Sequence, residues 1–248
     1  MCEFCRSGDE TLCTRGDILG LNSQGAFAEY VIAPVSSLVS VPAGVDAVTV
    51  AAVGLAMITA WHMLISRAHL TAGETVLVHA AGSGVGSAAI RIAKLAGAHV
   101  IATAGDEEKL TLARQLGADD VINYRQLDFA QEVRKLTGKR GVSVVVEHVG
   151  AETWEKSIAS LARKGRLVTC GATTGNDGPV NIWTVFAKEL SIIGAYGGTR
   201  ADLAQVLQLV AAGQLQPVIH RVLPLESVAE AQRMLEARET FGKIVITI

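Results

Sequence analysis

Residues 75–98 read TVLVHAAGSGVGSAAIRIAKLAGA, and this stretch decides the fold. A short apolar run at 76–79 is followed by Gly82, Gly84 and Gly86, and then by an Ala- and Ile-rich helical pattern. Glycine allows a sharp turn and lets backbone N–H groups come close to a ligand. The start of the following helix adds unpaired N–H groups and the positive end of its dipole. Together these features favour a bound pyrophosphate, so the sequence predicts a dinucleotide site.

The composition is typical of a densely packed α/β protein. The 248 residues suffice for one large or two small domains, and half of them are apolar while 19% are charged. With a pI near 6.3 and no basic stripe, the sequence predicts no nucleic-acid surface. The first ten residues, MCEFCRSGDE, carry charges and cysteines where a targeting signal needs an apolar core. We therefore expect a cytoplasmic protein.

Residues 47–66 contain no Asp, Glu, Lys or Arg and imitate a membrane span in length. Polar residues such as Thr49, Thr59 and His62 interrupt the stretch, and no aromatic belt or basic flank borders it. We predict a buried helix that leads into the nucleotide-binding region, and no membrane partner.

From residue 74 onward, apolar runs alternate with helical patterns. Strands are predicted at 75–79, 99–104, 120–123, 142–149, 165–170 and 190–195, and helices at 84–96, 106–116, 127–137 and 152–162. Apolar runs without alternation fit a parallel sheet that is buried on both faces. The repeated order predicts an α/β fold, a doubly wound parallel sheet with helices on both faces and right-handed crossovers. Asp106 is predicted to cap a helix, and Gly97 and Gly117 to follow helix ends.

The two ends of the chain do not continue this rhythm. The segments GAFAEYVIAP (25–34) and LVSVPAG (38–44) are predicted to form short strands. After residue 196 we expect a helix at 201–212, a strand at 218–225, a helix at 227–238 and a last strand at 243–248. These ends indicate two pieces of a second, mostly β domain.

Three cysteines near the start, Cys2, Cys5 and Cys13, follow a C-x2-C-x7-C pattern, and Cys170 lies far from them. Four thiolates in a tetrahedron form a closed structural zinc site, and a fourth ligand is expected just before the first residue. Two alternatives are ordinary reduced cysteines and a disulfide, although nothing indicates secretion. We predict that a structural zinc is possible.

These segments together resemble the medium-chain dehydrogenase/reductase superfamily of zinc-type alcohol dehydrogenases and quinone oxidoreductases. CEFCRSGDETLC resembles its structural-zinc lobe, and GAFAEYV, VLVHAAGSGVGSAAI, SVVVEHVG, GRLVTCGATTG and FGKIVI follow in family order. The resemblance implies a Rossmann domain at 55–195, flanked by remnants of a GroES-like catalytic β domain at 1–54 and 196–248. Family members carry an upstream segment with most of the catalytic domain, which implies a chain that lacks it.

The resemblance also bears on the chemistry. Zinc alcohol dehydrogenases place a catalytic-zinc cysteine where this chain has Leu55, which cannot bind metal. The resemblance therefore predicts no catalytic zinc. The implied function is an NAD(P)(H)-dependent oxidoreductase that transfers a hydride to or from a small carbonyl, alcohol or activated alkene. The alternatives are a zinc-dependent alcohol dehydrogenase and a nucleotide-binding protein without turnover.

The cofactor-binding residues are carried over from the family. The glycine loop departs from strict G-x-G-x-x-G, since its third glycine comes one residue early. The resemblance implies that Ser83, Gly84, Val85 and Gly86 lie against the pyrophosphate and nicotinamide, with Thr59 and Val85 behind the ring. It implies further contacts from His148, Val149, Gly150, Cys170, Gly171, Ala172, Gly194, Ala195 and Lys243. His148 could equally be a core histidine, Cys170 an inert thiol and Lys243 a solvated edge residue.

The choice between NADP(H) and NAD(H) depends on the end of the second strand. NAD enzymes usually carry an acidic residue there, whereas this chain has Ala104 followed by Gly105. Lys109 and Tyr124 match positions that contact the 2′-phosphate in NADPH-using quinone oxidoreductases. The acidic residues at 106–108 add negative charge to the same turn, and they are also explained as residues favoured by a helix dipole. We predict NADP(H) over NAD(H).

No acid–base pair stands out in the sequence, so the catalytic residues stay unknown. His62, on the entry helix, and His220, in a strand-like segment, are each explained more simply as packed residues. The cofactor carries the chemistry in zinc-free relatives. The expected partners are a small-molecule substrate and a second copy of the chain, in a homodimer or homotetramer joined near 190–195.

Overall fold

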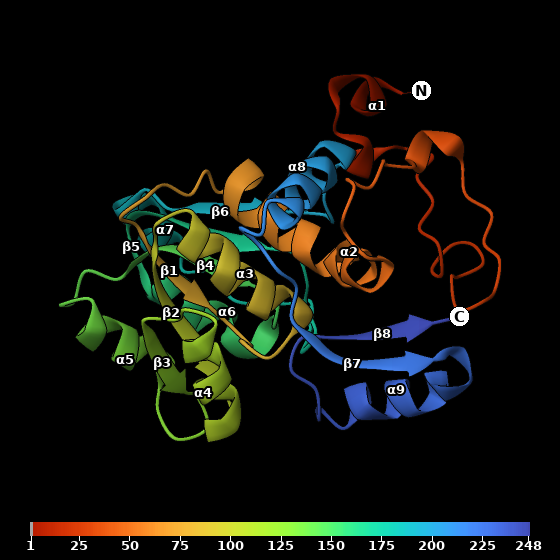
Figure 1. Cartoon of the computed structure of the whole chain (residues 1–248). Helices are drawn as coiled ribbons and strands as arrows, with labels where there is room; N and C mark the ends of the chain where they lie inside the picture. Colours follow the sequence, from red (N-terminus) through yellow and green to blue (C-terminus); the bar gives the residue numbers. More distant parts are fainter. Residues whose placement is uncertain (1) are drawn as a thin grey trace.

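The computed structural model describes residues 2–248, and its centre is a six-stranded parallel sheet (Figure 1). The strands are β1 (Thr75–Val78), β2 (His99–Ala104), β3 (Asp120–Asn123), β4 (Val142–Glu147), β5 (Leu161–Thr169) and β6 (Ser191–Gly194). They lie in the order β3-β2-β1-β4-β5-β6, so the direction of winding reverses between β1 and β4. This is the order of a Rossmann fold, which confirms the predicted fold class.

Helices cover both faces of the sheet because neighbouring strand residues point to opposite sides. They are α3 (Gly84–Leu95), α4 (Glu107–Gln115), α5 (Phe129–Leu136), α6 (Ala151–Ala159), α7 (Ile182–Lys188) and α8 (Arg200–Ala211). Val76 and Val78 face a core that includes α3, α4 and α8, whereas Leu77 packs with residues of α5 and α6. The alternation explains why the strands are apolar throughout.

The predicted helix ends are confirmed by the local geometry. Asp106 accepts a hydrogen bond from the backbone N–H of Lys109 at 2.8 Å. Gly97 and Gly117 have φ of +79° and +111° just after α3 and α4, a left-handed conformation that favours glycine. The helix α7 was not predicted, and β5 begins four residues before its predicted start because Leu161 already pairs with Val142.

The entry helix α2 (Ala47–Trp61) continues into a π-helical turn, η3 (His62–Arg67). It packs against α3 and α8, and half of its most apolar window is buried in the protein, as predicted for a core helix. Judged by length and composition alone, the helical stretch Ala47–Arg67 is also long and apolar enough to cross a membrane. The backbone kinks at Gly54, next to the predicted domain boundary.

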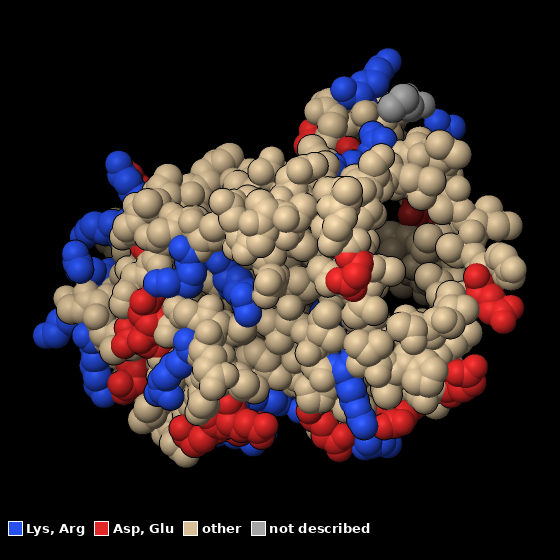
Figure 2. Space-filling view, in the orientation of Figure 1, with Lys and Arg blue, Asp and Glu red and all other residues tan. Residues whose placement is uncertain are grey.

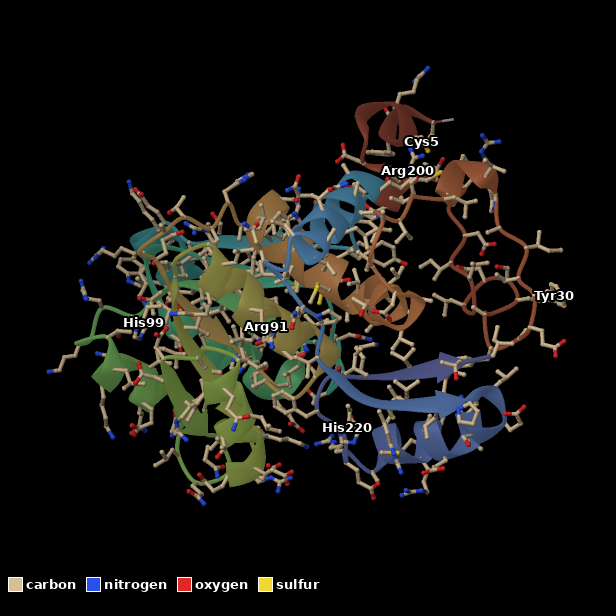
Figure 3. All side chains as sticks on the ribbon, in the orientation of Figure 1. Cys5, Tyr30, Arg91, His99, Arg200 and His220 are labelled. Carbon is tan, nitrogen blue, oxygen red and sulfur yellow. The ribbon has the colours of Figure 1, made fainter. Side chains whose placement is uncertain are left out.

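The remaining elements surround one end of the sheet. They are α1 (Glu3–Ser7), the 3-10 turns η1 (Glu10–Leu12), η2 (Val35–Ser37) and η4 (Leu225–Ser227), the parallel strands β7 (Ile219–Pro224) and β8 (Lys243–Thr247), and α9 (Val228–Glu236). Arg200, at the start of α8, holds the N-terminal segment in place (Figure 3): its guanidinium donates to the Ser36 carbonyl at 2.6 Å and contacts Glu10 at 3.3 Å.

The strands predicted at 25–34 and 38–44 are wrong. Both segments lie outside regular strands, and among residues 2–248 no other strand lies beside them to pair with their backbone. Tyr30 and Ile32 are 88% and 94% exposed, so the apolar residues of the first segment face no core. Figure 2 shows a hollow between this segment and the β7–β8 pair. A segment with a strand-like sequence forms a stable strand only where another strand pairs with its backbone.

Candidate active site

The glycine loop joins β1 to α3 and leaves two backbone donors free. Ser83 caps the helix by accepting a hydrogen bond from the Gly86 N–H at 2.8 Å. A Cβ on Gly86 would lie 2.3 Å from the Ala80 carbonyl oxygen, so only glycine lets α3 approach β1 this closely. The N–H groups of Gly84 and Val85 are the first of the helix and have no intrahelical partner. They are available to a phosphate.

The start of β8 crosses this loop and brings a cation to it. The Gly242 N–H donates to the Gly82 carbonyl at 2.8 Å. A Cβ on Gly84 would lie 2.8 Å from Cδ of Lys243 and 3.8 Å from its Nζ. An ammonium beside the positive end of α3 is unfavourable unless an anion lies between them. The residues therefore fit a bound pyrophosphate.

The end of β2 has room for a 2′-phosphate, but Lys109 is not free to bind it. Atoms of Tyr124 and Arg125 lie 2.8 Å and 3.0 Å from the position of a Cβ on Gly105. Lys109 donates to the carbonyl of Arg238 at 2.8 Å and lies 3.7 Å from Asp106, so its ammonium is engaged elsewhere. Sequence reasoning missed Arg125, whose guanidinium has no ion pair among residues 2–248. Its position directly after Tyr124 was the signal available.

Two of the three acidic residues on this turn are engaged locally. The Asp106 carboxylate caps α4, and Glu107 accepts a hydrogen bond from the Asn123 side-chain amide at 3.1 Å. Both contacts belong to the start of a helix, where acidic residues are favoured by the dipole. The buried side chain of Ala104, 3% exposed, offers no carboxylate to a ribose.

A cavity of about 650 Å³ lies at the carboxyl ends of β4, β5 and β6. This is the edge at which open α/β sheets bind their ligands. Six predicted cofactor residues line it: Gly150, Cys170, Gly171, Ala172, Gly194 and Ala195. The N-terminal segment closes one side with Asp9, Thr11 and Leu12, and η3 contributes His62 and Arg67. Burial raises the pKa of Cys170 to about 11, so this thiol is protonated at neutral pH and is a poor nucleophile.

Three other predicted contacts are not among the residues that line this cavity. The hydroxyl of Thr59 donates to the Leu55 carbonyl at 2.6 Å. His148 is mostly buried, with Nε2 3.1 Å from the His79 carbonyl, and burial lowers its pKa. The Val149 N–H donates to Glu147 at 2.8 Å.

A buried polar network beneath the glycine loop holds the turn that carries Gly150. Glu147 is fully buried and accepts hydrogen bonds from the backbone N–H of Gly150 at 3.2 Å and from the Ser157 hydroxyl at 2.6 Å. Burial opposes its charge, but His79 and these hydrogen bonds outweigh burial and lower the pKa of the Glu147 carboxyl. Burial also lowers the pKa of His79 to about 4, so at neutral pH the carboxylate is charged and the imidazole neutral.

On the cavity wall, His62 is paired with a residue from a distant part of the chain. Its Nδ1 lies 2.7 Å from Oδ2 of Asp202, and the Ser66 hydroxyl donates to Oδ1 at 2.6 Å. Burial opposes the charge of Asp202, but the hydrogen bonds from His62, Ser66 and Thr199 outweigh it and lower its pKa to about 2. No pattern in the sequence indicates this pair, since its members are 140 residues apart.

The three N-terminal cysteines come together as a possible metal site. The sulfurs of Cys2, Cys5 and Cys13 all lie within 4.8 Å of one another, and those of Cys2 and Cys5 are 3.6 Å apart. A tetrahedral zinc with Zn–S bonds of about 2.3 Å holds its sulfurs about 3.8 Å apart, so the three thiols fit zinc. Backbone N–H groups of Cys5 and Thr14 lower the pKa of Cys2 to about 6, which favours the thiolate that binds metal. Leu55, at the catalytic-zinc position, lies 69% exposed on α2 and has no donor atom.

Two known protein families match this chain, one over the sheet region and one over the N-terminal segment. Residues 84–212 match the family described as "Zinc-binding dehydrogenase". Residues 1–43 match the "Alcohol dehydrogenase GroES-like domain". The first match begins within the glycine loop, at Gly84, and includes strands β2 to β6, and the second includes the cysteine cluster.

Individual relatives agree with these matches. A quinone oxidoreductase of Pongo abelii is 33% identical over 97% of this chain and 75% of its own length. The crystal structure of an NAD-dependent alcohol dehydrogenase superposes with a TM-score of 0.93 at 44% identity, covering 100% of this chain and 72% of that one. A 2-octenoyl-CoA carboxylase reductase, solved in complex with NADP and 2-octenoyl-CoA, superposes with a TM-score of 0.85 at 29% identity, covering 91% and 55%.

Proposed function

The chain belongs to the medium-chain dehydrogenase/reductase superfamily, and we propose that it is an NADP(H)-preferring oxidoreductase acting on small molecules. The transferred group is a hydride, passed to or from a carbonyl, an alcohol or an activated alkene such as a quinone or enone. The relatives and the matched families are oxidoreductases, which supports the class of reaction.

One observation carries this proposal: the free N–H groups of the glycine loop and the cavity lie at the same edge of the sheet. The loop follows β1, and the cavity lies beyond β4, the strand next to β1. A dinucleotide bound along this edge would reach from the loop to the cavity, and its nicotinamide supplies the hydride when bound. The chain's own residues supply the pyrophosphate site, through Gly84, Val85 and Lys243, and the lining of the cavity.

The preference for NADP(H) rests on the end of β2. Ala104 leaves no carboxylate to hydrogen-bond a ribose 2′-OH, and Arg125, which forms no ion pair within residues 2–248, lies beside Gly105. An arginine at this place accommodates a 2′-phosphate in related folds. Tyr124 adds a hydroxyl to the same corner.

We also propose a structural zinc on Cys2, Cys5 and Cys13, and turnover that needs no catalytic zinc. The spacing of the three sulfurs supports the first part, and Leu55 at the catalytic-metal position supports the second. A zinc-dependent alcohol dehydrogenase would require a donor atom at that position.

An apolar surface at the edge of the sheet supports self-association. β6 is an edge strand, and α7 beside it exposes Trp183 and Phe186, 70% and 57% exposed, with ring centroids 4.8 Å apart. Exposed strand edges bordered by apolar side chains favour pairing with another chain. We propose that two copies meet here to form a homodimer.

The experiment that tests the function begins with the nucleotide. The chain is titrated with NADPH and NADH, and then assayed with quinones, enones and short alcohols, with and without a chelator. We expect tighter binding of NADPH and turnover that survives the chelator. Tighter binding of NADH would overturn the cofactor preference, chelator-sensitive alcohol oxidation would favour a zinc enzyme, and binding without any turnover would overturn the enzymatic function.

A further inference from the structure

The cavity wall contains a histidine–carboxylate pair that has no role in the proposed function as stated above. His62 is 8% exposed, begins the π-helical turn η3, and faces the cavity shared by Gly194 and Ala195. π-Helical turns are rare and frequently occur at functional sites. The turn is held at its far end, where Nε of Arg67 donates to the Gly194 carbonyl at 3.1 Å.

Asp202 fixes which nitrogen of the ring faces the cavity. The carboxylate of Asp202 is charged at neutral pH and can only accept hydrogen bonds, so Nδ1 of His62 donates to it over 2.7 Å. The other nitrogen, Nε2, has no hydrogen-bond partner among residues 2–248. Ser66 and Thr199 hold the carboxylate itself, at 2.6 Å and 2.9 Å. The imidazole is therefore fixed in orientation with one nitrogen free, the arrangement that general acid–base catalysis requires.

We propose that His62, oriented by Asp202, is the catalytic acid and base of this enzyme. This proposal rests on the proposed function. In reduction, the hydride adds to the substrate carbon, the π electrons move to the carbonyl or enolate oxygen, and Nε2–H of the imidazolium gives that oxygen its proton. The neutral imidazole keeps its Nδ1–H bond to Asp202 and takes a proton back from water at Nε2. In alcohol oxidation, neutral Nε2 accepts the hydroxyl proton as the hydride leaves.

The other titratable groups on the cavity wall suit this task less well. They are Asp9, Arg67, Cys170 and Tyr196. Arg67 is fixed to Gly194, and burial makes the Cys170 thiol a weaker acid than a free thiol. Asp9 comes from the N-terminal segment, and Tyr196 is 57% exposed, with no residue of the described chain that orients its hydroxyl. His62 alone in this set is both buried and fixed by a carboxylate.

The test compares His62→Gln, His62→Ala and Tyr196→Phe in the full chain. His62→Gln keeps a side-chain amide near Asp202, which guards against loss of folding. We expect both His62 variants to bind NADPH as the wild type does, while kcat falls by roughly 10²–10⁴-fold. Added imidazole should restore activity to His62→Ala, because the small side chain leaves space for the free base. The pH dependence of kcat should lose one limb that the wild type shows.

A matched control separates catalysis from the general effect of losing a histidine–aspartate pair. His99 pairs with Asp120 over 2.8 Å at the start of β2 (Figure 3), whereas the cavity lies at the carboxyl ends of the strands, and His99→Gln should leave kcat unchanged. Unchanged kcat in folded His62 variants, or loss of activity confined to Tyr196→Phe, would overturn the role of His62. A reduced kcat that imidazole does not restore, with the pH limb intact, would also overturn it. If the wild type binds nucleotide and turns over no substrate, the proposed function itself fails.

Discussion

The glycine loop offers a pair of substitutions that separates packing from nucleotide binding. An added Cβ at Gly86 would lie 2.3 Å from the Ala80 carbonyl oxygen and 2.9 Å from the His79 carbonyl oxygen, both backbone atoms of the β1 turn. At Gly84 the nearest atoms are Cδ of Lys243 at 2.8 Å, in a flexible side chain, and Cβ of Ala56 at 3.1 Å. The same substitution thus meets rigid backbone at one position and a movable lysine at the other.

The magnitudes follow from these contacts. Gly86→Ala forces α3 away from β1, and overpacking of this kind costs about 3 kcal/mol. The higher helix propensity of alanine offsets about 1 kcal/mol, which leaves a net loss of about 2 kcal/mol. In a chain of 248 residues this lowers Tm by about 4–8 °C. Gly84→Ala should cost less than about 1 kcal/mol of stability, yet raise the Kd for NADPH about tenfold by displacing Lys243 and covering the free N–H groups.

Urea unfolding followed by circular dichroism measures the first effect, and a fluorescence titration with NADPH measures the second. We expect Gly86→Ala to be the less stable variant and Gly84→Ala to bind NADPH more weakly. Equal stability of Gly86→Ala and wild type would refute the close approach of α3 to β1. Unchanged NADPH binding by Gly84→Ala would refute the placement of the pyrophosphate at this loop.

Three further outcomes are expected. Folding lowers the pKa of Asp202 from 3.8 to about 2, so the ionised carboxylate stabilises the folded chain by about 2 kcal/mol. This stabilisation is present above pH 4 and is lost as the pH falls toward 2. Measurements of unfolding free energy against pH should show that Asp202→Asn removes this part of the pH dependence. The purified chain should hold one zinc ion, measured by native mass spectrometry, and Cys5→Ser should release it, whereas a chain that takes up no zinc would contradict the site. Trp183→Glu should shift the chain from dimer to monomer in analytical ultracentrifugation, and a wild type that already sediments as a monomer would contradict the dimer.

Local patterns account for the elements that sequence reasoning placed correctly. β1 and α3 are formed by residues that are adjacent in the sequence. The Asp106 cap and the glycines after α3 and α4 act within one turn of a helix. The segment at 25–34 shows the limit of such patterns. Its run of apolar and aromatic residues resembles a strand, yet it pairs with no strand in the described chain, and most of its large side chains are exposed.

The sequence by itself determined the parallel sheet, the glycine loop and the cysteine cluster, because each depends on residues that are close together in the chain. Only the tertiary structure decided what surrounds them. Lys243 reaches the glycine loop because β8 crosses it, and Arg125 reaches Gly105 because β3 lies beside β2. The pairing of His62 with Asp202 depends on the packing of α2, which continues into η3, against α8. Contacts across 140 residues carry no periodicity, so folding alone brings the two side chains to one cavity.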